Sequence, residues 1–211
     1  MMIQMKRKGL IVVVSGFSGT GKGTLMKALT ARYDCYALSV SATTRDPRPG
    51  EKEGSEYFFI SDSEFEKMIE EDALVEHAGY CHHYYGTPKK FVEEQISIGK
   101  DVILEIEIQG ALQIKKKFPE ALLLFVMPPN VPELESRLRG RGTETDEVIH
   151  ERMLRAKTEA EGIEQYDYII INDQLDECVE QTHAVIEAAH YTPFRNEQFI
   201  EEIRQQLDEL I

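Results

Sequence analysis

The stretch Leu10–Thr24, LIVVVSGFSGTGKGT, decides the fold. Its first six residues, Leu10–Ser15, are rich in β-branched side chains and predict a short buried parallel strand. A glycine-rich loop, Gly16–Gly23, follows directly, and apolar residues at helical spacing begin at Leu25. A strand, a glycine loop and a helix in this order start a βαβ unit, so we expect an α/β fold.

The loop matches the phosphate-loop pattern GxxxxGK from Gly16 to Lys22. Its glycines let backbone N–H groups curl around phosphate oxygens, and the following helix directs its positive end toward them. Lys22 supplies a mobile charge for the β- and γ-phosphates. A turn that merely links strand to helix is the alternative, and the clear strand and helix on either side disfavour it. The expected phosphate-binding residues are Gly16, Phe17, Ser18, Gly19, Thr20, Gly21, Lys22, Gly23 and Thr24.

One position departs from the usual phosphate loop. Gly23 stands where most such loops have the serine or threonine that helps to hold magnesium, and Thr24 comes one residue later. We therefore expect no dedicated protein metal site, with Mg²⁺ held mainly by nucleotide phosphates and water, as suits an ion that dehydrates reluctantly.

Composition excludes several classes of protein. The 211 residues suffice for one domain with a small inserted subdomain, and the net charge of −14 disfavours binding to nucleic acid or an anionic membrane. The three cysteines are widely spaced without a CxxC pair, so we expect free thiols and neither a disulfide framework nor a structural zinc site. The apolar run at residues 10–14 is too short for a signal peptide or a membrane span, which indicates a cytoplasmic protein.

The remaining elements follow from hydrophobic periodicity and turn signals. Further strands are predicted at Tyr57–Ile60, Val102–Ile108, Leu122–Met127 and Tyr168–Ile171. Helices are predicted from Ser61 or Ser63 onward, at Leu134–Arg141, at Thr143–Lys157 and at Leu175–Ala189. Residues 39–57 look like loop and turn, and we expect the tail 196–211 to pack on the core as a closing helix.

A second set of polar residues suggests a site for another phosphate. Ser41–Glu51 reads SATTRDPRPGE, and further on come Glu76 and the tetrapeptide YYGT at residues 84–87. Guanidinium groups such as those of Arg45 and Arg48 match the geometry of phosphate oxygens. Each of these residues alone would be an ordinary solvated side chain, and it is their joint spacing that favours a ligand site.

These motifs, together with the phosphate loop, resemble those of guanylate kinases over residues 9–190. The Lys-Gly-Thr ending of the loop resembles adenylate kinases and many bacterial guanylate kinases. The resemblance implies transfer of the γ-phosphoryl group of ATP to GMP, with Mg²⁺ accompanying ATP. It implies a P-loop nucleoside monophosphate kinase fold, a parallel-sheet core with helices on both faces. The expected parts are a core of residues 9–42, 90–130 and 158–190, a GMP-binding insertion 43–89, a lid 131–157 and a helical extension 191–211.

The resemblance also implies roles in binding GMP. Arg45, Arg48, Tyr57 and Tyr85 match residues that bind the GMP phosphate, whereas Ser41 and Thr87 match residues at the edge of the guanine ring. Glu76 matches the carboxylate that accepts the N1–H and 2-amino donors of guanine. Adenine lacks this pair of donors, so a buried Glu76 left unpaired would reject it.

Two carboxylates accompany the strand predicted at Val102–Ile108. Alternation along a strand would place Glu105 and Glu107 on the same face. A carboxylate there is costly unless it meets metal-bound water or a donor-rich ligand. The family often has aspartates at these positions. We assign Glu107 to the acceptor nucleotide or to metal-bound water, and keep Glu105 as a further candidate for the GMP site.

A basic segment completes the expected site. Arg137, Arg141 and Arg152 match the family's arginines that close over the phosphates, and with Lys22 and Arg45 they are the expected catalytic residues. Phosphoryl transfer needs mainly positioning and stabilisation of charge, which arginines supply. Arg139 has no counterpart in the family and is expected to be solvated.

Asn172 matches a position near the adenine of ATP. Two alternatives to a guanylate kinase remain at this stage. One is another P-loop small-molecule kinase, for example one acting on a ribose phosphate, although Glu76 and Ser41 would then have nothing to bind. The other is a non-catalytic guanylate-kinase-like domain that binds a phosphorylated protein. Lys22 and the lid arginines argue against that alternative.

Overall fold

The core of the protein is a five-stranded parallel sheet. The computed structural model describes residues 8–80, 82–140, 142 and 145–210. The strand order is β2 (Tyr36–Leu38), β7 (Asp101–Glu105), β1 (Ile11–Gly16), β8 (Leu122–Met127) and β9 (Tyr168–Ile171). All neighbouring pairs are parallel. The predicted α/β class is confirmed, as are the predicted strands around β1, β8 and β9.

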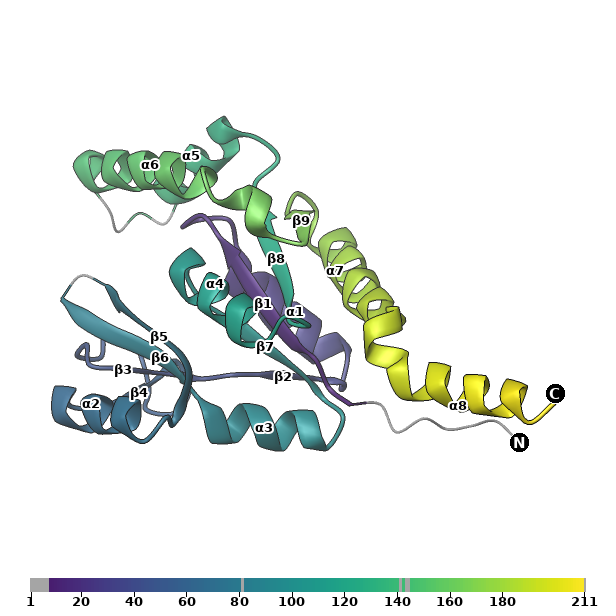
Figure 1. Cartoon of the computed structure of the whole chain (residues 1–211). Coiled ribbons are helices and arrows are strands. Elements are labelled where there is room, and N and C mark those ends of the chain that lie inside the picture. Colours follow the sequence, from purple (N-terminus) through teal and green to yellow (C-terminus); the bar gives the residue numbers. More distant parts are fainter. Residues whose placement is uncertain (1–7, 81, 141, 143–144, 211) are drawn as a thin grey trace.

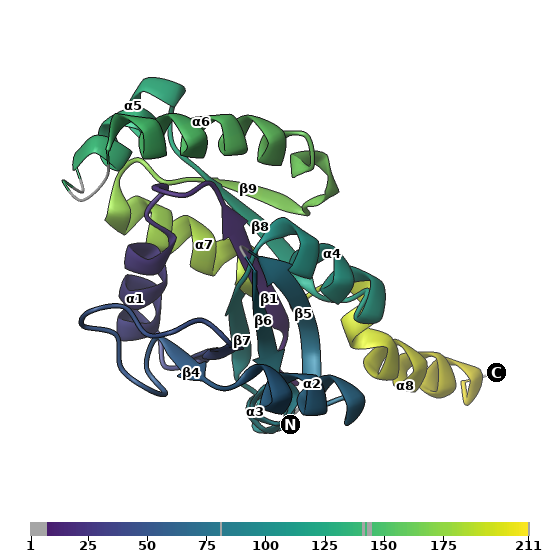
Figure 2. The same ribbon diagram turned by 90° about the vertical axis from the view of Figure 1, so that its left-hand side faces the viewer.

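Helices cover both faces of this sheet. Figure 2 shows α1 (Lys22–Arg32) and α7 (Leu175–Ala189) on one side and α4 (Ile108–Lys117) on the other. Val12 and Val14 of β1 pack in the apolar cluster that includes residues of α1 and α7. Ile11 and Val13 pack in the cluster that includes residues of α3 (Lys89–Ser97) and α4. Because β1 is buried on both faces, its sequence is continuously apolar rather than alternating.

A second, smaller sheet lies beside the core (Figure 1). Its order is β4 (Tyr57–Phe59), β3 (Ser41–Thr43), β6 (His83–Pro88) and β5 (Leu74–Tyr80). Strand β3 falls within residues predicted as loop, and that prediction was wrong here. The strand has only three residues and is specified by parallel pairing with β4 and antiparallel pairing with β6, which a local pattern does not reveal.

Helix α2 (Asp62–Glu70) packs on this small sheet through Phe65, which is fully buried. Of the two candidate caps, Ser61 is the one used. Its hydroxyl accepts the backbone N–H of Glu64, and the Glu64 side chain accepts the backbone N–H of Ser61. This reciprocal capping box fixes where α2 begins.

Two helices, α5 (Val131–Gly140) and α6 (Asp146–Ala160), lie together over one end of the core sheet (Figure 1). Leu134, Leu138 and Ile149 pack with Phe17 of the phosphate loop and Phe125 of β8. A short 3₁₀ turn, η1 (Ile163–Gln165), leads from α6 to β9. The two helices are therefore packed directly against the phosphate loop.

Strand β7 ends earlier than the sequence suggested. It stops at Glu105, and Glu107 is the N-cap residue of α4, which begins at Ile108. The chain must leave the sheet to enter α4, so alternation along a strand does not apply beyond Glu105. The expectation that Glu105 and Glu107 share one strand face was therefore wrong.

The C-terminal helix α8 (Glu197–Asp208) forms but does not close the core. None of its described residues is buried, and Leu207 is 55% exposed. Figure 1 shows it leading away from the sheet after the 3₁₀ turn η2 (Pro193–Asn196). Its start is held by Arg195, which donates to the carbonyls of Lys8 and Gly9 at 2.6 and 3.0 Å. The periodicity correctly predicted a helix, but the expected burial of this helix on the core was wrong, because none of its described residues is buried. Among the described residues, no helix is long and apolar enough to cross a membrane.

Ending the chain after Asn196 should leave the core almost as stable as in the full chain. Because α8 buries none of its described residues, we expect the free energy of unfolding in urea to change by less than about 1 kcal/mol. The matched control is Ile186→Ala on α7, which removes a fully buried side chain and should cost about 2–5 kcal/mol. A truncation as costly as that control would mean that α8 packs on the core in solution.

Candidate functional site

The phosphate loop joins β1 to α1 in a conformation that depends on glycine. Gly21, the N-cap residue of α1, is left-handed with φ 85° and ψ 20°. A Cβ there would also lie 2.7 Å from the side-chain nitrogen of Asn172. No acidic residue stands in the first turn of α1. The positive end of the helix is thus not neutralised and can act on an anion in the loop.

Bonds within the loop fix its shape. Lys22 Nζ donates to the carbonyls of Gly16 and Phe17 at 2.6 and 3.1 Å, so its ammonium lies over the loop. Thr20 is fully buried, and its hydroxyl also donates to the Phe17 carbonyl, at 3.0 Å. These contacts stabilise the conformation of the loop and place the Lys22 ammonium against its backbone carbonyls.

Asn172 and Arg137 reach the loop from two other elements. Asn172 follows β9, is 7% exposed, and donates its side-chain amide to the Thr20 carbonyl at 2.8 Å. Arg137 of α5 donates to the backbone carbonyl of Asn172 at 2.9 Å, while Glu133 one turn earlier accepts from its Nε at 2.7 Å. Both predicted residues therefore lie beside the phosphate loop.

Arg152 is a further predicted site arginine that contacts the phosphate loop. Arg152 of α6 donates to the hydroxyl of Ser18 in the phosphate loop. Arg141 lies outside the described residues. Arg139 is half exposed and forms ion pairs with Glu135 and Asp146, as suits a surface side chain.

A second cradle forms on the small sheet around Arg45. Its guanidinium donates two hydrogen bonds to the Glu51 carboxylate, with nitrogen–oxygen distances of 2.9 and 3.0 Å. Only 12% of the Arg45 side chain is exposed. The guanidinium carbon lies 5.3 Å from the ring centre of Tyr57, and the Tyr57 and Tyr85 rings are 5.9 Å apart. Burial raises the pKa of Tyr57, so its hydroxyl keeps its proton and can donate.

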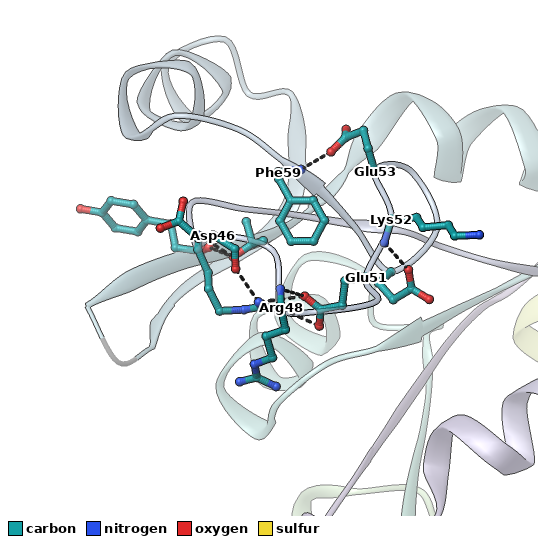
Figure 3. A network of polar contacts seen from close by, with 10 residues as sticks. Asp46, Arg48, Glu51, Lys52, Glu53 and Phe59 are labelled. Carbon is teal, nitrogen blue, oxygen red and sulfur yellow. Dashed lines mark hydrogen bonds and ion pairs between the residues drawn. The ribbon is translucent and has the colours of Figure 1, made fainter.

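Glu51 was not singled out in the sequence, yet it organises this loop. Besides holding Arg45, its carboxylate accepts the backbone N–H of Arg48 at 2.8 Å. Figure 3 shows the Arg48 side chain extending away from this contact. The guanidinium of Arg45, through its hydrogen bonds, holds the pKa of Glu51 below its ordinary value. Its place six residues after Arg45, in a turn rich in proline and glycine, is the signal that could have indicated this pairing.

Glu76 is the most deeply buried carboxylate in this part of the molecule. It lies on β5, is 5% exposed, and accepts a hydrogen bond from the Thr87 hydroxyl at 2.8 Å. Burial raises its pKa to about 7. Ser41, at the start of β3, belongs to the same small sheet.

Gly110 is a site residue that the sequence analysis missed. It is buried in the first turn of α4, and a Cβ there would lie 2.6 Å from Glu76 Oε2. Any side chain at this position would displace the carboxylate. A glycine inside an otherwise helical pattern is the available signal, because such a glycine often marks a close approach.

Glu105 lies between the two cradles. Its Oε2 is 4.0 Å from the position a Cβ would take at Gly23. Loss of solvation by the surrounding protein raises the pKa of the Glu105 carboxyl group, and the positive charge of Lys22 opposes that rise. Glu105 in turn contributes to the raised pKa of Tyr57. It therefore acts electrostatically on both the phosphate loop and the Arg45 cradle.

Glu107 faces α6 rather than a strand neighbour. Arg155 of α6 donates to its carboxylate at 3.2 Å and to Glu159 at 2.7 Å. Arg155 was not predicted, and its ion pair with Glu107 links the start of α4 to α6, where Ile108 also packs with apolar residues of α6. In the sequence, Arg155 stands four residues before Glu159, which indicates only an ordinary ion pair on a helix surface.

The protein is a P-loop kinase: it has a glycine phosphate loop between β1 and α1, with two arginine-bearing helices packed against that loop. The chain belongs to the guanylate kinase family, whose family model, described as guanylate kinase, matches residues 8–189.

Individual relatives agree over nearly the whole length. A guanylate kinase of Caldanaerobacter subterraneus subsp. tengcongensis is 47% identical over 204 residues, covering 97% of this chain and 99% of that protein. One from Halalkalibacterium halodurans is 49% identical, with 95% and 97% covered. The crystal structure of guanylate kinase from Anaplasma phagocytophilum superimposes with a TM-score of 0.74 at 30% identity, covering 90% of each chain.

Replacing Glu51 with glutamine should destabilise the protein, because Arg45 would lose its charged partner while remaining largely buried. We expect Glu51→Gln to lower the free energy of unfolding by about 1–3 kcal/mol at pH 7, as measured by urea unfolding. Glu56→Gln is the matched control, since the exposed Glu56 side chain accepts only a backbone N–H, from Lys52. Equal stabilities of the two variants would contradict an organising role for Glu51.

Proposed function

We propose that this protein is a guanylate kinase that transfers the γ-phosphoryl group of ATP to GMP. The observation that carries the proposal is Glu76, a carboxylate that is 5% exposed and lies on the small sheet, apart from the phosphate loop. A buried carboxylate is costly unless donors meet it. Guanine offers two adjacent donors and adenine does not, so Glu76 would select GMP as the acceptor.

On the donor side, the loop from Gly16 to Thr24 would hold the ATP phosphates. Lys22 already lies over the loop and would move from its carbonyls to the β- and γ-phosphate oxygens. Arg137 and Arg152 contact the loop through the Thr20 carbonyl and the Ser18 hydroxyl and would stabilise charge on the transferring group. For Arg141 the same role stays a prediction from sequence. Asn172, which lies beside Thr20, would contact ATP.

The residues present fit a hydrated magnesium ion. Gly23 offers no hydroxyl, but the Glu105 carboxylate lies beside it, close enough to Lys22 for their charges to interact. Oxygen acceptors that bind through water are what Mg²⁺ uses at phosphate sites. When bound with ATP, Mg²⁺ would supply positive charge that offsets the charge of the phosphates. Glu105, and Glu107 at the start of α4, would accept hydrogen bonds from its waters.

On the acceptor side, the Arg45 cradle would bind the GMP phosphate. Glu51 occupies one edge of the Arg45 guanidinium, and the remaining N–H groups, with Arg48 and the hydroxyls of Tyr57 and Tyr85, would donate to the phosphate. Ser41 and Thr87 would complete the guanine pocket around Glu76. We propose residues 43–89 as the GMP-binding insertion, 131–157 as the lid and 191–211 as an extension without a part in catalysis.

The first test is a coupled assay of ADP release with ATP and Mg²⁺. We expect release to require GMP, with AMP, CMP and UMP at least about 100-fold poorer, because none of them offers the pair of adjacent donors that Glu76 would accept from guanine. Lys22→Ala should lower kcat by at least about 100-fold. Lys27→Ala, on the exposed face of the same helix, should retain normal activity. Release with AMP in place of GMP would overturn the proposal. So would the absence of ADP release with all four monophosphates.

The pKa of Glu76 predicts how stability depends on pH. Its value of about 7 in the folded protein exceeds the value of about 4.3 expected in the unfolded chain. The folded state therefore holds the proton more tightly, and the cost of burying Glu76 grows as pH rises from about 4 to 7. Glu76→Gln should raise the free energy of unfolding by about 1–3 kcal/mol at pH 8 and by less than about 1 kcal/mol at pH 5.

Urea unfolding at the two pH values checks this, with the exposed Glu70→Gln as the control. A gain that does not depend on pH would contradict the expected titration. GMP affinity should follow the same group, because only the carboxylate accepts both guanine donors. The affinity advantage of the parent protein over Glu76→Gln should shrink as pH falls below 7. Taking the ratio of the GMP affinities of the two proteins at each pH removes the effect of ionisation of the GMP phosphate itself.

A further inference from the structure

A group of potential metal ligands lies at the opposite end of the core sheet from the phosphate loop. The ligand atoms of Cys35, His183 and Glu187 all lie within 4.8 Å of one another. Those of Asp101, Glu187 and His190 do so as well. We propose that Cys35, His183 and Glu187 bind a Zn²⁺ ion, supported by the neighbouring Asp101–His190 pair. The sequence predicted no structural zinc site, because these residues are far apart along the chain and only the fold assembles them.

The fold places these residues from three elements. His183 and Glu187 are four residues apart on α7, so they share one face of the helix, and His190 is its C-cap residue. Cys35 directly precedes β2, whose Tyr36 pairs with Asp101, the first residue of β7. Glu105 stands at the far end of the same strand, about 13 Å away at the usual rise per residue. The cluster is therefore separate from the kinase site.

The ring of His183 is held in place from two sides. Tyr33 stacks on it with ring centres 3.7 Å apart and planes inclined by 14°. The Tyr36 hydroxyl lies 2.6 Å from its Nδ1, and Tyr36 is 4% exposed. Metal-binding histidines are commonly oriented by such neighbours, which limits the reorganisation that binding requires.

The Asp101–His190 pair fixes the end of α7 against the sheet. Asp101 is fully buried, accepts the backbone N–H of Leu10 at 2.8 Å, and lies 3.0 Å from His190 Nε2. Glu187, about one turn before His190, has a carboxylate oxygen within 4.8 Å of ligand atoms of both this pair and Cys35. Cys35, His183 and Glu187 are each only half-buried, so an ion can reach them from solvent.

The chemistry of the three ligands selects the metal. A thiolate, an imidazole and a carboxylate form a ligand set that zinc uses with tetrahedral geometry, and water can fill the fourth position. Mg²⁺ and Ca²⁺ prefer oxygen ligands alone. On binding, the Cys35 thiol gives its proton to the buffer and the thiolate bonds to the metal. The ion would tie α7 to the segment before β2.

The test is a calorimetric titration of Zn²⁺ into the full chain, freed of metal with a chelator and without nucleotide. We expect one ion per chain, at least tenfold weaker binding for Cys35→Ser and for Glu187→Gln, and a rise in melting temperature with Zn²⁺ for the parent but not for these two variants. Glu180→Gln is the matched control, because Glu180 is an exposed acid on the same helix, paired with Arg32. It should bind Zn²⁺ as the parent does.

Cobalt provides a second readout. Co²⁺ bound through Cys35 should give a thiolate charge-transfer absorption that Cys35→Ser abolishes and Glu180→Gln retains. Kinase activity without added zinc, at the distant site, shows that each variant is folded. Absence of stoichiometric Zn²⁺ binding, or equal binding by the parent and both cluster variants, would overturn the proposal. Equal binding would assign the ion to other surface groups.

Discussion

The parallel pairing of β1 with both β7 and β8 is the constraint on which the site depends. Val14 stands opposite both Glu105 and Leu124, and two residues further on Gly16 stands opposite Val126. Because all strands run the same way, the segments that follow them leave at one edge of the sheet. Glu105, the phosphate loop and Asn172 are thereby brought together from distant parts of the chain. The bond from the Asn172 amide to the Thr20 carbonyl joins the end of β9 directly to the loop.

The elements predicted correctly are those whose signal is local. Strands β1, β8 and β9 are short apolar runs of the core sheet, although β9 is a largely exposed edge strand. The phosphate loop has a fixed spacing, so a single sequence suffices for these elements. Strand β3 and the end of β7 depend on partners and on the entry into α4, which no local pattern encodes. Periodicity predicted that α8 is a helix. It could not predict whether another element would cover its apolar side.

The same distinction holds within the site. Arg45 and Glu76 could be chosen because their residue types match a phosphate and a guanine edge. Glu51 and Gly110 act on them indirectly, one by holding a guanidinium and the other by leaving room for a carboxylate. Arg155 joins α6 to Glu107 across 48 residues. Such supporting contacts depend on side-chain placement in three dimensions, and a single sequence carries little trace of them.

The acidity of the chain and the anionic character of its substrates are compatible because charge is sorted locally. The net charge is −14, yet the first turns of α1 and α4, which follow β1 and β7 into the site, contain no acidic residue. Helix α3 also has none there, whereas α2, α5, α6, α7 and α8 each have at least one. Acids in a first turn stabilise a helix by compensating its dipole. Helix α4 has the carboxylate of Glu107 at its N-cap position, whereas α1 has no acid at its start. Leaving α1 uncompensated forgoes that stabilisation and keeps its positive end available to an anion in the phosphate loop.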